Sequence, residues 1–211
     1  KVYLFDDSKK ILDRRYLVEE FIEGTHPKKV DNQLMILMGK WYKKLHKNRI
    51  KRKVRPLSKR DSFIRYKKFK HILDKNKREE LDKLFSQTKE ILDKYNYVFK
   101  NVKYLSLNHG DPSRMNVFYD GKSVRLIDWE FVHYNLPEAD LTFFVWSYNL
   151  NEKQKKLFLD SYGYPKTDHY NKRFNLKMLA HLWGMISWRL ERLDLVKKGK
   201  FVDYKQVNIL P

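Results

Sequence analysis

Hydrophobic residues change their spacing twice along the 211-residue chain. Between residues 81 and 95 they recur every three or four positions, which is typical of the buried face of an amphipathic helix. From residue 104 to 127 they form only short runs, and Asp120-Gly121 between two of these runs is a strong signal for a tight hairpin turn. Helical spacing returns after Pro137 and predicts helices at residues 141–148, 153–162 and about 175–195. The pattern therefore predicts a mainly helical chain with a small group of strands near its middle.

The start of the chain has a different pattern. Residues 1–5 and 16–22 are rich in β-branched and aromatic side chains, and a polar stretch separates them, so we expect two strands joined by a turn. A glycine and a proline interrupt this pattern within residues 23–27, which is the best candidate boundary. A polar residue at position 31 or 32 can then cap a helix whose apolar residues continue to Leu45.

The charge of the chain is large and unevenly distributed. Lys and Arg number 46 against 26 Asp and Glu, which gives a net charge of +20. Residues 43–60 hold ten Lys or Arg and no acid, so we expect an exposed basic segment. Such a segment is most often a solvated face, and it is also a surface that nucleic acid or an acidic partner can bind.

Composition excludes several classes of protein. With 42% hydrophobic and 15% aromatic residues the chain can bury a core, which argues against disorder. No uncharged apolar run approaches the roughly 18 residues of a membrane-spanning helix, and we expect no span and a cytoplasmic protein. The absence of cysteine rules out disulfides and thiolate metal sites. The histidines are scattered without metal-ligand spacing, which favours structural or surface roles.

Between positions 108 and 130 the chain has polar residues that the formation of strands and turns alone does not require. Asp111 and Asn116 are five positions apart across a loop that contains Pro112, and Asp128 follows an apolar strand of the predicted hairpin. This layout can bring three oxygen ligands to one point. Mg²⁺ needs only a few such oxygens when water and substrate phosphates complete its shell, and phosphoryl transfer also needs a carboxylate near the attacking hydroxyl.

Two stretches carry a resemblance to a known family. Residues 109–116 (HGDPSRMN) followed by residues 126–130 (LIDWE) resemble the catalytic and metal-binding loops of the aminoglycoside phosphotransferase and choline kinase superfamily, which are relatives of protein kinases. Residues 18–24 (VEEFIEG) resemble the hinge between the two lobes of these enzymes. The resemblance implies an α+β, protein-kinase-like fold, mainly the helical C-terminal lobe with a catalytic-loop β-hairpin. Residues 1–23 would then be a remnant of the N-terminal lobe with the hinge, and residues 24–211 the helical lobe.

The resemblance also implies roles for the polar residues. Asp111 would be the catalytic base or the carboxylate that orients the hydroxyl, and Asn116 and Asp128 would bind Mg²⁺. His109 would brace the catalytic loop without taking part in the chemistry, and Asp140 would help to hold that loop.

The same family resemblance implies an ATP site. Backbone groups of Glu20 and Ile22 would hydrogen-bond adenine, with Phe118 and Ile127 beneath its ring. The family also places a Gly-rich loop and a phosphate-binding Lys before the hinge, and neither is found in the residues that precede it here. Either the chain is a piece of a longer kinase, which its two opening strands favour, or the ATP clamp is absent.

These motifs say less about which molecule accepts the phosphoryl group. Tyr134, Trp146 and Trp183 could help to form a cage for a quaternary ammonium group, although Trp183 also lies on the core face of its predicted helix. Glu130 could position substrate or metal, or could form an ordinary ion pair. Choline kinases carry a second Trp where this chain has Ile186, so the cage would be incomplete.

The expected function is therefore ATP- and Mg²⁺-dependent phosphoryl transfer to a hydroxyl of a small polar molecule, of choline/ethanolamine kinase or aminoglycoside phosphotransferase type. Two alternatives stay open. One is a kinase of an RNA or protein substrate that docks on residues 43–60. The other is a kinase-like binding module without turnover, which engages nucleic acid or an acidic surface through the same segment.

Overall fold

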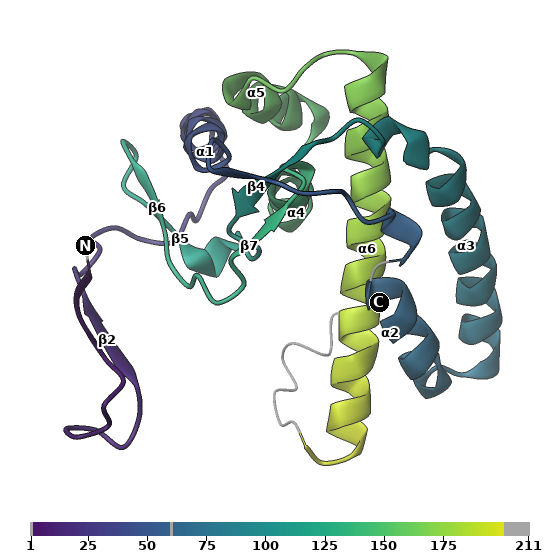
Figure 1. Cartoon of the computed structure of the whole chain (residues 1–211), viewed down its shortest axis with the longest axis horizontal. Helices are drawn as coiled ribbons and strands as arrows, with labels where there is room; N and C mark the ends of the chain where they lie inside the picture. The colour runs from purple at the N-terminus through teal and green to yellow at the C-terminus, as the bar shows by residue number, and fades with distance from the viewer. Residues whose placement is uncertain (1, 60, 201–211) are drawn as a thin grey trace.

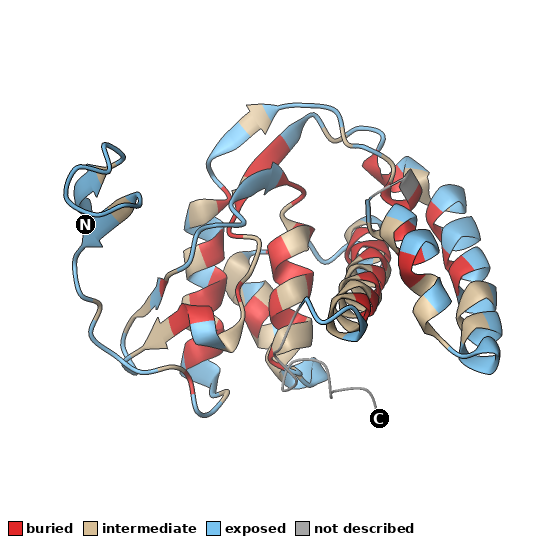
Figure 2. Cartoon of the chain, turned by 90° about the horizontal axis from the view of Figure 1, so that it is seen from below, coloured by how far each residue is buried: buried red, intermediate tan, exposed pale blue. Residues whose placement is uncertain are grey.

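The computed structural model describes residues 2–59 and 61–200, and its first element is the predicted strand pair. Strands β1 (Val2–Asp6) and β2 (Tyr16–Glu19) pair antiparallel. Figure 1 shows this hairpin standing apart from the helical body. Its apolar side chains remain exposed, with Phe5 at 61% (Figure 2). The two strands are confirmed, although the second is shorter than expected.

A first hydrophobic core joins α1 (Asn32–Leu45), α4 (Glu138–Ser147) and α5 (Glu152–Tyr162). The Asp31 carboxylate accepts a hydrogen bond of 2.7 Å from the backbone N–H of Leu34, and this cap fixes where α1 begins. At the other end of the unit, α5 stops at Gly163, which has a left-handed φ of +80° that favours glycine. These helices lie where helical spacing predicts them.

Gly39 allows α1 and α5 to pack closely. A methyl group on Gly39 would lie 2.6 Å from the carbonyl oxygen of Phe158 and 2.8 Å from the backbone nitrogen of Tyr162, and neither backbone atom can swing aside. We therefore expect Gly39→Ala to lower the free energy of unfolding by about 1–3 kcal/mol in urea denaturation. Gly184→Ala is the matched control. Its methyl group would meet no atom within 4 Å, so this variant should gain about 0.5–1 kcal/mol from a stronger helix preference. Equal changes in both variants would refute the close-packing explanation.

A second hydrophobic core joins α2 (Asp61–Phe69), α3 (Lys75–Lys94) and the long α6 (Asp168–Lys197), which lie side by side in Figure 1. The Phe85 ring is stacked on Tyr66 with centroids 4.9 Å apart and is perpendicular to Trp183 at 5.3 Å, and the Tyr66 and Trp183 rings are themselves 5.0 Å apart. Phe85 and Leu92 of the stripe predicted between residues 81 and 95 are buried here, with Leu81 packed against them, whereas Leu84 and Ile91 of the same stripe are exposed.

Two small sheets lie between the helices. In the first, β4 (Tyr104–Asn108) pairs antiparallel with β3 (Arg49–Lys51) on one side and with β7 (His133–Asn135) on the other. The end of β4 therefore leads directly into the residues that follow Asn108. This sheet fixes the start of the predicted catalytic loop.

The second sheet is the predicted hairpin of β5 (Val117–Tyr119) and β6 (Val124–Leu126). Its turn is built on Asp120, whose carboxylate accepts hydrogen bonds from the backbone N–H groups of Lys122 and Ser123. These bonds favour the charged form and lower the pKa of Asp120 to about 2. Four 3₁₀ helices in the described residues complete the secondary structure: η1 (Leu57–Lys59), η2 (Lys70–Ile72), η3 (Asn96–Phe99) and η4 (Arg114–Asn116).

The structure differs from the sequence-based expectation at several elements. α6 begins at Asp168, well before residue 175, because the Thr167 hydroxyl caps it by accepting from the backbone N–H of Tyr170. Residues 49–51 of the basic segment form a strand.

No helix among residues 2–59 and 61–200 is both long and apolar enough to cross a membrane. Lys1, Arg60 and residues 201–211, which belong to the predicted strand, basic segment and helical lobe, lie outside the described residues.

Candidate active site

The loop between β4 and β5 holds the first two predicted site residues, and the structure brings them together. The Asn116 side-chain Nδ2 donates to the backbone oxygen of Asp111 and to its carboxylate Oδ2, each at 3.0 Å. Asn116 is buried and Asp111 is half-buried. Because Asn116 uses its amide nitrogen for both bonds, its amide oxygen faces away from Asp111. The pair thus presents a carboxylate and an amide oxygen at the end of one loop.

His109 connects this loop to the end of β6. Its Nδ1 accepts from the backbone N–H of Asp111 at 3.4 Å, so the proton lies on Nε2, which donates to the backbone oxygen of Ile127 at 2.9 Å. The His109 ring also packs on Trp129, with centroids 4.6 Å apart. Two segments that are separate in sequence are therefore held together by one buried ring.

Asp128, the third predicted oxygen ligand, follows directly after this connection. The backbone N–H of Ile127 donates to the backbone oxygen of Asn116 at 3.0 Å, which places Asp128 next to the Asn116 loop. Asp128 has a φ of +61° and an exposed side chain. A non-glycine residue in this left-handed region is strained, and such residues occur preferentially at functional sites.

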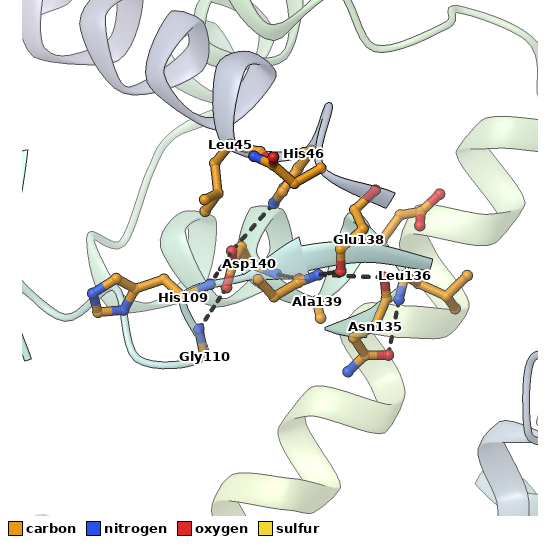
Figure 3. Close-up of polar contacts among 12 residues, drawn as sticks. Leu45, His46, His109, Gly110, Asn135, Leu136, Glu138, Ala139 and Asp140 are labelled. Carbon is orange, nitrogen blue, oxygen red and sulfur yellow. Dashed lines mark hydrogen bonds and ion pairs between the residues drawn. The ribbon is translucent and has the colours of Figure 1, made fainter. Parts of the chain in front are cut away.

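Asp140 binds the backbone of the loop that follows β4, as the dashed lines to His109 and Gly110 in Figure 3 show. Its carboxylate accepts from the backbone N–H of His109 at 2.8 Å and from that of Gly110 at 3.0 Å. Asp140 is buried in the first turn of α4, where the helix dipole also favours a negative charge. Gly110 has a φ of +91°, and a methyl group there would lie 2.3 Å from the backbone oxygen of Phe131, so only glycine fits between these partners.

His46 completes the support of Asp140, a role that no sequence pattern predicted. Its Nε2 lies 3.2 Å from Asp140 Oδ2, and its Nδ1 lies 3.1 Å from the hydroxyl of Tyr162. Burial raises the pKa of Tyr162, so its hydroxyl keeps its proton. The basic segment therefore contains a buried residue that anchors the end of α1 to the catalytic loop.

The donor set fits a hard cation that shares its shell with phosphates. The Asn116 amide oxygen and the Asp128 carboxylate are ligands of the kind that Mg²⁺ takes. Among the described residues no group of three or more His, Cys, Asp or Glu side chains could hold a metal ion. Binding of Mg²⁺ at this site would accordingly depend on oxygens supplied by a substrate.

The predicted adenine contacts come from two segments that meet at β5. Glu20 is exposed and Ile22 is half-buried, and both follow β2. A backbone bridge between Thr25 and Tyr119 then brings the following residues to the hairpin that carries Phe118. Ile127 follows β6 of the same hairpin and is half-buried. The hinge segment and the hairpin therefore share one edge of the helical body.

The aromatic residues predicted near the acceptor do not form one cage. Trp183 is 4% exposed in the core of α2, α3 and α6, which corrects its placement in a substrate site. Trp146 is half-buried and packs on the ring of His181. Tyr134 lines a cavity, whereas the side chain of Glu130 is exposed.

That cavity has a volume of about 550 Å³ and lies beside the catalytic loop. Gly110, the residue before Asp111, forms part of its wall together with β7 and one face of α6. Arg52, Lys53 and Arg55 of the basic segment line it as well. Part of the basic segment thus lines a cavity whose size suits a small molecule. The interpretation of this segment as a solvated surface did not predict that.

Comparisons with known proteins agree with this architecture. The model of the phosphotransferase enzyme family (APH) matches residues 1–172. A LicA homolog of Metamycoplasma hominis is 38% identical over 77 residues, which are 35% of this chain and 31% of that protein. A LicA homolog of Mycoplasma capricolum subsp. capricolum is 22% identical over 207 residues, covering 97% of this chain and 80% of that protein.

A solved structure shares the fold. The choline/ethanolamine kinase family protein of Mesorhizobium loti superposes with a TM-score of 0.68 at 16% sequence identity, over 98% of this chain and 68% of that protein. At this identity the likeness shows the α+β, protein-kinase-like fold alone. The family model, however, covers most of the sequence, including the loop that contains Asp111 and the segment that contains Asp128. The chain belongs to the phosphotransferase enzyme family.

Proposed function

We propose that the protein transfers the γ-phosphoryl group of ATP to a hydroxyl of a small polar molecule. The observation that carries this proposal is the hydrogen-bonded pair of Asp111 and Asn116, which follows Gly110, a residue in the wall of a cavity of about 550 Å³. The cavity is of a size that suits a small molecule, which favours this function over phosphorylation of an RNA or a protein. Family membership supports the same reaction type.

In this proposal the half-buried Asp111 carboxylate faces the acceptor hydroxyl. It orients the hydroxyl and takes its proton as the new oxygen–phosphorus bond forms and the bond from the γ-phosphorus to the departing ADP breaks, while Asn116 keeps the carboxylate in place. Asn116 and Asp128 would hold Mg²⁺, which when bound neutralises charge on the phosphates. His109 and Asp140 fix the loop and touch no reacting atom.

We further propose that residues 1–23 belong to the nucleotide-binding lobe and residues 24–211 to the helical lobe. The separation of the β1–β2 hairpin from the helical body in Figure 1 supports this division. In this arrangement the backbones of Glu20 and Ile22 bind adenine, and Phe118 and Ile127 lie beneath its ring.

We expect Mg²⁺ binding to depend on nucleotide. The protein alone offers an amide oxygen and one carboxylate at this point, so its affinity for Mg²⁺ should be weak until phosphate oxygens complete the shell. Titration of the full-length protein with Mg²⁺, with and without a non-hydrolysable ATP analogue, checks this dependence. Asp128→Asn should weaken the nucleotide-dependent binding, whereas Asp168→Asn, an exposed carboxylate on α6, should not. Equal Mg²⁺ affinity with and without nucleotide would contradict the assignment.

Choline and ethanolamine are the first acceptors to test, because a solved structure of the same fold is a choline/ethanolamine kinase family protein. The experiment incubates the full-length protein with ATP, Mg²⁺ and each acceptor, and follows the phosphorylated product directly. Phosphorylation of a small hydroxyl compound, lost in Asp111→Asn, is the expected result. ATP-dependent phosphorylation of proteins or RNA alone would instead support the macromolecular alternative.

A further inference from the structure

The cavity beside Gly110 has a wall that the motifs do not explain. Its α6 side consists of Lys177, Ala180, His181, Gly184 and Met185, whose three- and four-residue spacing places them on one helix face. Gly184 contributes no side chain, and a methyl group on it would meet nothing within 4 Å. The hollow is thus bounded by two polar side chains, one turn apart on a rigid helix.

His181 lies in the wall of this cavity and carries an unpartnered ring nitrogen. Its ring packs on Phe143 and Trp146, with centroids 4.9 and 5.3 Å away, and its Nε2 is buried without a hydrogen-bond partner among the described residues. Burial, together with the nearby charge of Lys177, lowers the pKa of His181 to about 4. The ring is therefore neutral at pH 7. A buried ring nitrogen without a partner is costly unless a bound molecule supplies one.

Charge on the rest of the wall is mainly positive. Lys177 is 7% exposed, and Arg52, Lys53 and Arg55 also line the cavity. Among the described residues of the lining, Asp61 is the one carboxylate, and it forms an exposed ion pair of 3.5 Å with Arg55. A wall of this kind disfavours a quaternary ammonium group and attracts an oxyanion.

We propose that the acceptor carries an oxyanion, a carboxylate or a phosphate, in addition to the hydroxyl that receives the phosphoryl group. Lys177 and the Arg52–Arg55 segment bind the oxyanion, and His181 hydrogen-bonds to it through Nε2. This inference rests on the proposed function, because it places the acceptor hydroxyl at the Gly110 side of the cavity, next to Asp111. It also gives part of the basic segment a role in acceptor selection.

The test compares acceptors that differ only by a carboxylate. Serine is ethanolamine with an added carboxylate, and glycerate is ethylene glycol with the same addition. For the full-length protein with ATP and Mg²⁺, we expect kcat/KM to favour the carboxylate member of each pair by about tenfold or more. Calorimetric titration of each compound, without ATP, gives a binding readout that does not need turnover.

Substitutions in the cavity wall test whether these residues cause the preference for carboxylate acceptors. Lys177→Met removes one cation of the wall and should lower the serine-to-ethanolamine ratio of kcat/KM by about tenfold. His181→Phe keeps the packing on Phe143 and Trp146 but removes Nε2, and should lower the same ratio. Arg52→Met, on an exposed part of the wall, serves if Lys177→Met does not fold. Lys172→Met is the control on α6, since Lys172 pairs with Asp168 outside the cavity lining.

The outcomes separate this inference from the proposed function. If ethanolamine or ethylene glycol is phosphorylated and the carboxylate compounds neither bind nor react preferentially, the inference is wrong and the proposed function stands. If serine or glycerate binds through Lys177 and no compound is phosphorylated, the cavity assignment stands and the proposed function fails. Absence of binding by both carboxylate compounds, or an unchanged ratio in all three wall variants, overturns the inference.

Discussion

Replacing Asp111 with Asn should lower the rate of phosphoryl transfer by about 10²–10⁴-fold, the usual contribution of a positioned general base. The change removes one charge and keeps the shape of the side chain. An Asn at this position can still accept from Asn116 Nδ2 through its amide oxygen, so the loop should keep its geometry. Nucleotide affinity should stay within about threefold, because Asp111 acts on the acceptor and the adenine contacts lie elsewhere.

The measurement pairs product formation by the full-length protein with a nucleotide titration of the same variant. Asp74→Asn is the matched control, since it makes the same chemical change at the N-cap of α3, where Asn and Asp cap equally well. Asp74→Asn should transfer phosphate at the wild-type rate. Retained turnover in Asp111→Asn would remove Asp111 from the chemistry, and a parallel loss of nucleotide binding would show that the loop itself had changed.

The helices were predictable wherever an apolar stripe and a capping residue coincide. α3 shows its stripe over four turns, and α5 ends at a glycine, so both were predicted from local signals. The start of α6 was missed because its first two turns, from Asp168, carry polar and aromatic residues without the stripe. The short β3 lies in a lysine-rich run with no alternation, and it forms because β4 offers it backbone partners. Tertiary context of this kind leaves no local pattern.

The residues of the candidate site also include some that the sequence predicted and some that it did not. The oxygen-bearing residues were predicted because they depart from what strands and turns need, and the structure joins Asp111 to Asn116 directly. His46 was missed because its partner Asp140 is 94 positions away, and no spacing rule connects them. The helical spacing of Trp183 predicted burial in the core, and this was correct. Its aromatic ring suggested a binding site, which was wrong because an aromatic ring suits a core and a binding site equally.

Removing the Asp140 carboxylate should produce the largest loss of stability among substitutions around the catalytic loop. In Asp140→Ala the backbone N–H groups of His109 and Gly110 and the ring N–H of His46 lose their acceptor inside the protein. Each unsatisfied buried donor costs about 1–3 kcal/mol, and partial relaxation limits the sum, so the free energy of unfolding should fall by about 3–5 kcal/mol. Phosphoryl transfer should fall as well, because the residue before Asp111 is no longer fixed.

Urea denaturation, with turnover measured under conditions where the variant remains folded, checks both effects. Asp160→Ala is the control, because that carboxylate forms a solvent-exposed ion pair with Lys166 and its loss should cost less than about 1 kcal/mol. His46→Leu is the graded case. It removes one of the three donors and leaves both backbone bonds of Asp140 intact, so it should cost less stability than Asp140→Ala and affect turnover less. If His46→Leu impairs turnover as severely as Asp140→Ala, the loop is held chiefly through α1 and not through the two backbone N–H groups, and the support assigned to Asp140 is wrong.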